Sequence, residues 1–172
     1  YISKLDKILR FLPRPADYLF LYFLNFLIIL LVLKVDYKLA FLGALAFGFS
    51  TYLIIILGVG HNAKAHAIAY MPLVLAGILL ALQNKYLQGF VLTTIAMSLE
   101  INASHPQMTY YLGFSVLILG VFYLIDAYKQ KKIPDFIKSI SVLVVAVILA
   151  VGMNATSLMA TKDYASFSTR GK

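Results

Sequence analysis

Residues 39–60 read LAFLGALAFGFSTYLIIILGVG, a stretch without a single charged side chain. At a rise of 1.5 Å per residue, a helix of this length spans roughly 30 Å, which is the thickness of the hydrocarbon core of a bilayer. Backbone polar groups inside that core must find their hydrogen bonds within the protein, and a helix satisfies them locally. This stretch therefore predicts a transmembrane helix.

The rest of the chain repeats the pattern. Of its 172 residues, 62% are hydrophobic and 13% are charged, and the mean hydropathy is +0.87. A soluble domain of this length needs more polar surface than so few charges supply. We therefore predict an all-α, polytopic transmembrane helix bundle that forms one domain. Its six expected spans cover about residues 16–33, 39–58, 67–82, 87–102, 106–125 and 136–153.

Both ends of the chain are more polar than the spans. In residues 1–14 apolar side chains recur at helical spacing while Asp6 and Arg10 fall on the other face, which is typical of an amphipathic helix at a membrane interface. Residues 154–172 are expected to form a polar tail at the outer face. Because the chain begins without Met and without a signal-peptide pattern, we expect it to be a fragment of a longer protein.

The formal net charge of +8 bears on the partners of the protein. Its basic residues form short clusters between apolar segments, where anionic lipid headgroups are the natural counter-ions. Membrane lipid is thus the expected partner, and nucleic acid is not. The absence of cysteine excludes a disulfide framework and a thiolate metal site.

Lysine is distributed unevenly between the two sets of loops. One set carries seven lysines, whereas the opposite set, between the spans, carries only Lys64. By the positive-inside rule the lysine-rich side faces the cytoplasm, so both ends of the chain are expected at the outer face. The seven are Lys34, Lys38, Lys85, Lys129, Lys131, Lys132 and Lys138.

Three stretches are more polar than a connecting loop requires. They are residues 60–66 (GHNAKAH), residues 100–109 (EINASHPQMT) and residues 154–172. With alternating spans, all three emerge at the outer face. They contain every histidine of the chain and its single glutamate, Glu100.

Each of these polar residues is open to a simple structural role and to a functional one. The structural role is that of solvated loops and helix caps, with Asn62 and His105 at helix starts. Glu100 directly follows an apolar helix, where an ionised carboxylate is costly unless it is paired or hydrated. It can pair with Lys64, bind a divalent cation with His105, or act as a base. The spacing matches no recognised metal motif, so a cofactor is left open.

Four stretches resemble the bacterial YfhO-like membrane protein family. They are FLPRPADYLFLYF (residues 11–23), GALAFGFSTYLIIILGVGHNAKAHAIAYMPLVLAGI (residues 43–78), LEINASHPQMTYYL (residues 99–112) and FSTRGK (residues 167–172). Members resemble lipid-dependent glycosyltransferases of the GT-C architecture and are linked to the glycosylation of cell-envelope polymers from a polyprenyl-phosphate sugar. The resemblance implies a multi-pass protein of the bacterial inner membrane, of which this chain is an internal fragment from the N-terminal half.

The resemblance also suggests site residues. We assign Glu100 and His105 to catalysis. A leaving lipid phosphate needs cationic groups or a metal where charge develops, which His105 can supply as a cation, and Glu100 can bind a metal or orient the acceptor. Enzymes of this architecture usually place a catalytic acidic residue in a first large external loop, which would precede Tyr1, so the chain alone is not expected to be active. The residues expected to bind phosphate or substrate are His61, Asn62, Lys64, His66, Asn102, Gln107 and Arg170.

Two other classes of function compete with the transferase. A transporter or flippase for lipid-linked sugar usually carries ionisable residues near the middle of the bilayer. Here the middles of the spans are uncharged, and Asn25 is their strongest polar residue. That distribution favours chemistry at the membrane surface. The third alternative is a non-catalytic membrane subunit.

Overall fold

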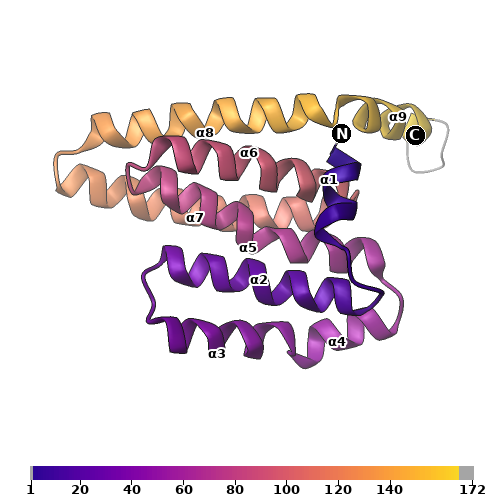
Figure 1. Cartoon of the computed structure of the whole chain (residues 1–172). Coiled ribbons are helices and arrows are strands. Elements are labelled where there is room, and N and C mark those ends of the chain that lie inside the picture. Colours follow the sequence, from indigo (N-terminus) through magenta and orange to yellow (C-terminus); the bar gives the residue numbers. More distant parts are fainter. Residues whose placement is uncertain (1, 167–172) are drawn as a thin grey trace.

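The computed structural model describes residues 2–166, and within that range the chain forms nine α-helices and no strand (Figure 1). The predicted all-α bundle is therefore confirmed. The helices are α1 (Ile2–Leu9), α2 (Ala16–Val32), α3 (Tyr37–Gly48), α4 (Thr51–Gly58), α5 (Asn62–Leu82), α6 (Tyr86–Asn102), α7 (Pro106–Lys129), α8 (Ile133–Met153) and α9 (Ala155–Ser166).

Every expected span coincides with helix. Within the described part of the chain, four segments are long and apolar enough to cross a membrane, namely α5, α7, α8 and the stretch Tyr37–Gly58, which comprises α3 and α4. That stretch is interrupted where Ser50 adopts an extended conformation before α4. The apolar helix α2 is shorter, with 17 residues, and α6 has the same length. The total of six crossings remains a prediction.

Tight turns reverse the chain between successive helices. The residues Lys34, Asn84 and Lys131, which follow α2, α5 and α7, have positive φ values of 60°, 65° and 58°. In each turn the next backbone N–H bonds back to the carbonyl five residues earlier, as Val35 does to Leu30 at 3.1 Å. This arrangement satisfies the free carbonyls at the helix end. The helices on the two sides of each of these three turns consequently run antiparallel (Figure 1).

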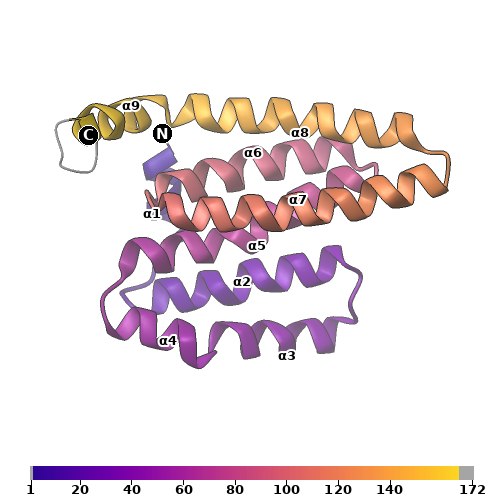
Figure 2. The same cartoon turned by 180° about the vertical axis from the view of Figure 1, so that it is seen from behind.

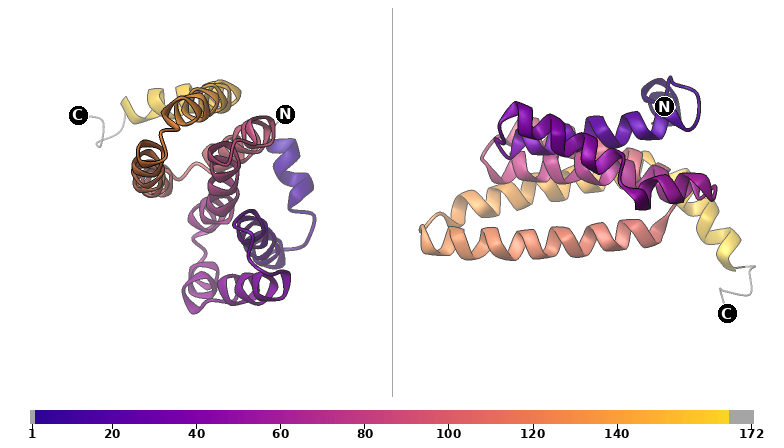
Figure 3. Two further views of the ribbon diagram at one scale, coloured as in Figure 1. Left: turned by 90° about the vertical axis from the view of Figure 1, so that its left-hand side faces the viewer. Right: turned by 90° about the horizontal axis from the view of Figure 1, so that it is seen from below.

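The pair α5 and α6 forms the centre of the bundle, with α2 to α4 on one side and α7 and α8 on the other (Figures 1 and 3). The two central helices approach closely because small residues face each other. A Cβ atom added to Gly77 of α5 would lie 2.5 Å from Thr93 Oγ1, and one added to Gly89 of α6 would lie 2.5 Å from the backbone nitrogen of Ala81. Small residues at such contacts are typical of helix packing in membranes.

Polar side chains in the apolar helices connect neighbours through backbone carbonyls. Asn25 of α2 donates to Ala69 O of α5 at 2.8 Å, which accounts for the polar residue that the sequence places inside a span. On the other side of the centre, Ser139 of α8 donates to Ala81 O at 2.9 Å. Asn154, which ends α8, donates to Ser98 O of α6 at 3.0 Å. These bonds fix α2 and α8 against the central pair.

The structure corrects the two terminal segments. Helix α1 ends at Leu9, short of the predicted residue 14, and its Asp6 is only 3% exposed although the sequence assigns it to a solvated face. In the predicted polar tail, residues 155–166 form the helix α9. Four helices also begin before the expected start of their span, namely α3 at Tyr37, α5 at Asn62, α6 at Tyr86 and α8 at Ile133.

Candidate functional site

The three polar stretches meet at one end of the bundle. Figure 1 shows α1, the start of α5, the connection between α6 and α7, and α9 at the same end, and Figure 2 shows this arrangement from behind. The turns that carry Lys34, Lys85 and Lys131 lie at the opposite end. The expected convergence of the polar stretches is thus present in the fold. We call this end the polar end.

A buried ionic cluster holds α1 against α5 at the polar end. The carboxylate of Asp6 accepts a hydrogen bond from Tyr70 Oη at 2.8 Å and lies 2.6 Å from His66 Nε2 through the same oxygen, Oδ1. Its other oxygen, Oδ2, accepts from Arg10 Nη2 at 2.8 Å and Nε at 3.1 Å. We call these four residues the Asp6 cluster. Each oxygen of the carboxylate thus has two hydrogen-bond partners from the protein.

Electrostatics within the cluster favour the charged carboxylate. Burial alone would raise the pKa of Asp6, but the hydrogen bonds from His66, Arg10 and Tyr70 outweigh burial and lower the pKa from its ordinary value of 3.8 to about 2. Arg10 also lies 3.4 Å from Asp17 Oδ2 and stacks over the Tyr18 ring. His66, expected to bind phosphate, therefore has its Nε2 already bound to Asp6.

Glu100 occupies a different environment. Its side chain is fully buried near the end of α6, where Thr109 Oγ1 of α7 lies 3.0 Å from Oε1 and 3.1 Å from Oε2. One hydroxyl proton serves only one of these two oxygens at a time. Among residues 2–166 no ion pair joins Glu100 to a basic side chain, and Lys64 instead lies over the ring of Tyr52, with Nζ 5.3 Å from its centroid.

A cavity of about 410 Å³ opens beside Glu100 at the polar end. His105, the N-cap of α7, contributes to its wall, and its buried Nδ1 has no hydrogen-bond partner among residues 2–166. A buried polar nitrogen without a partner is uncommon in proteins and often has a functional reason. We call this space the polar cavity. Its polar lining residues are Ser104, His105, Thr109, Ser157 and Thr161.

The remaining predicted site residues are spread over the polar end. His61 and Asn62 are exposed at the start of α5. Asn102 accepts a hydrogen bond from Ser3 at 3.3 Å, and Gln107 donates to Tyr111 at 2.9 Å. Arg170 lies outside the described residues. Of the predicted set, His105 lines the polar cavity and Glu100 reaches it through Thr109.

Metal binding was left open by the sequence. In the described part of the chain, no three or more His, Asp or Glu side chains are grouped so that they could hold a metal ion. The alternative in which Glu100 and His105 bind a divalent cation therefore has no third ligand of these types among the described residues.

Two functional features were missed from the sequence. Asp6 and Arg10 have the i, i+4 spacing of a helical ion pair, so their contact could have been predicted from the sequence. That spacing does not indicate that the pair is buried. Thr109 lies one turn into α7 and has no sequence signal, since its partner Glu100 belongs to another helix.

No protein-family model, curated protein or solved structure matches this chain.

Proposed function

We propose that this chain is the membrane part of a YfhO-like glycosyltransferase that takes sugar from a polyprenyl phosphate at the outer face of the bacterial inner membrane. One observation carries the proposal: Thr109 and His105 line a cavity at the polar end of the bundle, and the buried Glu100 accepts a hydrogen bond from Thr109. A lipid-linked sugar likewise combines an apolar hydrocarbon chain with a polar reacting group at one end.

The reaction assigns a separate role to each of the three residues. An acceptor hydroxyl attacks the anomeric carbon, the bond from that carbon to the phosphate oxygen breaks, and the lipid phosphate leaves with the electron pair. The acceptor's proton passes to Thr109, whose own proton passes to Glu100. His105 stabilises the leaving phosphate, together with the positive end of the α7 dipole. Glu100 thus acts through Thr109, because its own side chain is fully buried.

The orientation of the chain follows from its lysines. The seven lysines lie in the turns at the end opposite the polar end or in the adjoining ends of the helices, and positively charged loops are retained in the cytoplasm. Both described ends of the chain and the polar cavity then face the outside, where cell-envelope polymers are glycosylated.

Cysteine labelling tests this orientation. We expect Asn62→Cys and Ser104→Cys to react with an impermeant maleimide added to intact spheroplasts, because both positions are exposed at the polar end. Asn84→Cys, exposed in the turn after α5, should react only after the membrane is opened. The sequence of 172 residues contains no cysteine, so the introduced thiol is the only one in this chain that can react with the maleimide. Labelling of positions 62 and 104 from opposite sides would exclude the proposed topology.

Sugar transfer tests the roles of the three residues. In the intact protein, Glu100→Gln, Thr109→Val and His105→Ala should each slow transfer from a polyprenyl-phosphate sugar by roughly 10²-fold to 10³-fold, the usual cost of removing one preorganised polar contact. Thr109→Ser keeps the hydroxyl and should retain activity within roughly tenfold of the wild type. Matched controls are Asp126→Asn, an exposed carboxylate at the other end, and Thr94→Val, whose hydroxyl bonds within its own helix.

A flippase would give a different result in the same proteoliposomes. It would move a labelled polyprenyl-phosphate sugar between leaflets without acceptor and leave the glycosidic bond intact. We therefore measure donor cleavage and donor translocation in parallel for the wild type and for the variants at Glu100, Thr109 and His105. Translocation without cleavage by the wild type, or full transfer by all three variants that remove these groups, would contradict the transferase.

A further inference from the structure

Helix α1 lies across the bundle instead of along it. Figure 1 shows α1 running crosswise to α5 and α6 at the polar end, and the left view of Figure 3 shows it at the edge of the bundle away from α7. Because α5, α7 and α8 are long and apolar enough to cross a membrane, a helix that lies crosswise at their end runs in the plane of the membrane. Its position corresponds to the headgroup layer, where amphipathic helices bind.

The contacts of α1 determine which of its sides faces outward. Ile2 and Asp6, one helical turn apart, are buried, and the Asp6 cluster bonds this side of α1 to α5. Ser3 donates a hydrogen bond to Asn102 of α6 at 3.3 Å. Rotation of α1 about its axis would break these contacts, so the remaining side stays exposed.

The exposed side of α1 and the loop after it carry three cations. The acidic side chains among residues 2–17, Asp6 and Asp17, are each only 3% exposed, and both bind Arg10. No ion pair within residues 2–166 involves any of the three exposed cations. Their counter-charge therefore has to come from outside the described residues. The three are Lys4, Lys7 and Arg14.

Two large apolar side chains adjoin these cations. Ile8 is 68% exposed and Phe11 is 69% exposed. The ring of Phe11 meets the ring of Phe20 edge-on, with 5.6 Å between the centroids, which connects it to the beginning of α2. A water-soluble polyanion gains nothing from these side chains, whereas a membrane removes them from water. Cations together with exposed apolar groups thus favour an anionic lipid surface as the partner.

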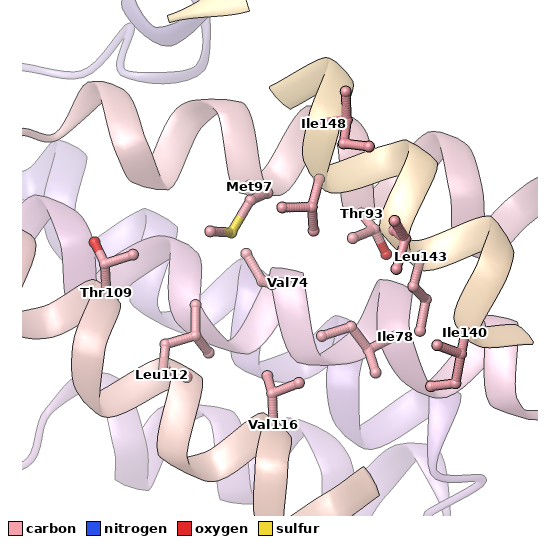
Figure 4. A pocket seen from close by; sticks show the side chains of 13 residues that line it. Val74, Ile78, Thr93, Met97, Thr109, Leu112, Val116, Ile140, Leu143 and Ile148 are labelled. Carbon is pink, nitrogen blue, oxygen red and sulfur yellow. The ribbon is translucent and has the colours of Figure 1, made fainter. Parts of the chain in front are cut away.

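The groove between α7 and α8 offers no such combination. Its volume is about 380 Å³, and the described side chains that line it are apolar apart from Thr93 and Thr109 (Figure 4). Since none of them is charged, the groove cannot distinguish lipids by the charge of their headgroups. Any selectivity for anionic lipid therefore belongs to α1.

We propose that the exposed side of α1 and the loop after it form a docking surface for anionic phospholipid. We call it the α1 surface, and its residues are Lys4, Lys7, Ile8, Phe11 and Arg14. The three cations bind the acidic headgroups, while the two apolar side chains enter the adjoining acyl layer. The partner is the lipid of the membrane that holds the bundle, so this inference is independent of sugar transfer.

Tryptophan fluorescence in vesicles tests the α1 surface. The sequence contains no tryptophan, so Phe11→Trp introduces a reporter, and the unsubstituted protein measured in parallel gives the background. Both leaflets contain equal amounts of phosphatidylglycerol and zwitterionic phosphatidylcholine, with bromine in the acyl chains of one or the other. Bromine quenches tryptophan on contact. We expect phosphatidylglycerol to be enriched roughly fivefold at residue 11, which corresponds to the attraction of about one cation to an anionic leaflet.

Two triple variants with this reporter identify the source of the enrichment. The first neutralises the cations of the α1 surface and should reduce the enrichment from roughly fivefold to about one. It combines Lys4→Gln, Lys7→Gln and Arg14→Gln. The second is the matched control, which removes the same charge at the opposite end of the bundle and should leave the enrichment unchanged. It combines Lys38→Gln, Lys85→Gln and Lys129→Gln. All six side chains are exposed, so circular dichroism should show the same helix content in both variants.

Three results would overturn the α1 surface. One is equal quenching by the two brominated lipids in the protein that carries only Phe11→Trp. Another is enrichment of phosphatidylglycerol that survives neutralisation of the three cations. The third is quenching by neither lipid, and binding of dextran sulfate that depends on the same cations would then assign them to a water-soluble polyanion.

Discussion

Replacing Asp6 with alanine is expected to lower the free energy of unfolding by about 3–5 kcal/mol, the usual cost of removing one partner from a buried ion pair. The change leaves the guanidinium of Arg10 without its closest carboxylate and removes the shared acceptor of His66 and Tyr70. Unfolding of the purified protein in detergent micelles, followed by circular dichroism, measures the effect.

Two further variants interpret that result. Asp126→Ala removes an exposed carboxylate and should change the stability by less than about 0.5 kcal/mol. The double change Asp6→Leu with Arg10→Met replaces the ion pair by apolar side chains and should recover part of the loss. A stability of Asp6→Ala within about 1 kcal/mol of the wild type would show that the Asp6 cluster does not hold α1 in place.

The same carboxylate predicts an acid dependence of stability. Because the pKa of Asp6 falls from 3.8 to about 2 on folding, its stabilising effect is complete above about pH 4 and is lost as the pH falls through 2. Across this window the wild type should lose roughly 2 kcal/mol more than Asp6→Asn does. Equal acid sensitivity of the two proteins would contradict the shift.

Replacing Gly89 with leucine is expected to destabilise the protein by about 4 kcal/mol or more, in the range reserved for severe overpacking. The first atom of any side chain at Gly89 would lie 2.5 Å from the backbone nitrogen and 2.7 Å from the Cα atom of Ala81. Backbone atoms cannot rotate away as a side chain can, so α6 must separate from α5. Gly89→Ala should already cost about 1–3 kcal/mol.

The control for Gly89 is Gly120, which has open space on α7. Gly120→Leu should leave the stability unchanged or raise it slightly, because leucine favours a helix more than glycine does by about 0.8 kcal/mol. Thermal unfolding of Gly89→Ala, Gly89→Leu and Gly120→Leu in one detergent measures all three. A Gly89→Leu protein as stable as the wild type would contradict the close packing of α5 against α6 at this position.

Much of the fold could be predicted from the sequence, and the reason is the bilayer. Uncharged stretches such as residues 39–60 must form helices to satisfy their backbone in lipid, so the elements were predictable from charge and length alone. Short turns between antiparallel helices then placed residues 60–66 and 100–109 at the same end of the bundle. The predicted span boundaries differ from the helix ends by at most five residues.

The tertiary structure alone decided which polar groups meet and which helix faces are buried. In a helix that is apolar all round, the face toward lipid and the face toward protein have the same chemistry, so no periodicity distinguishes the packed side of α5 from the open side of α7. The partners Asp6 and His66 lie 60 residues apart, and Glu100 meets Thr109 across a turn. The hydropathy of each segment determines its depth in the membrane. The contacts between polar groups depend instead on how each helix is rotated about its axis, because rotation decides which side chains face a neighbouring helix. Close packing of small residues such as Gly77 and Gly89 sets that rotation.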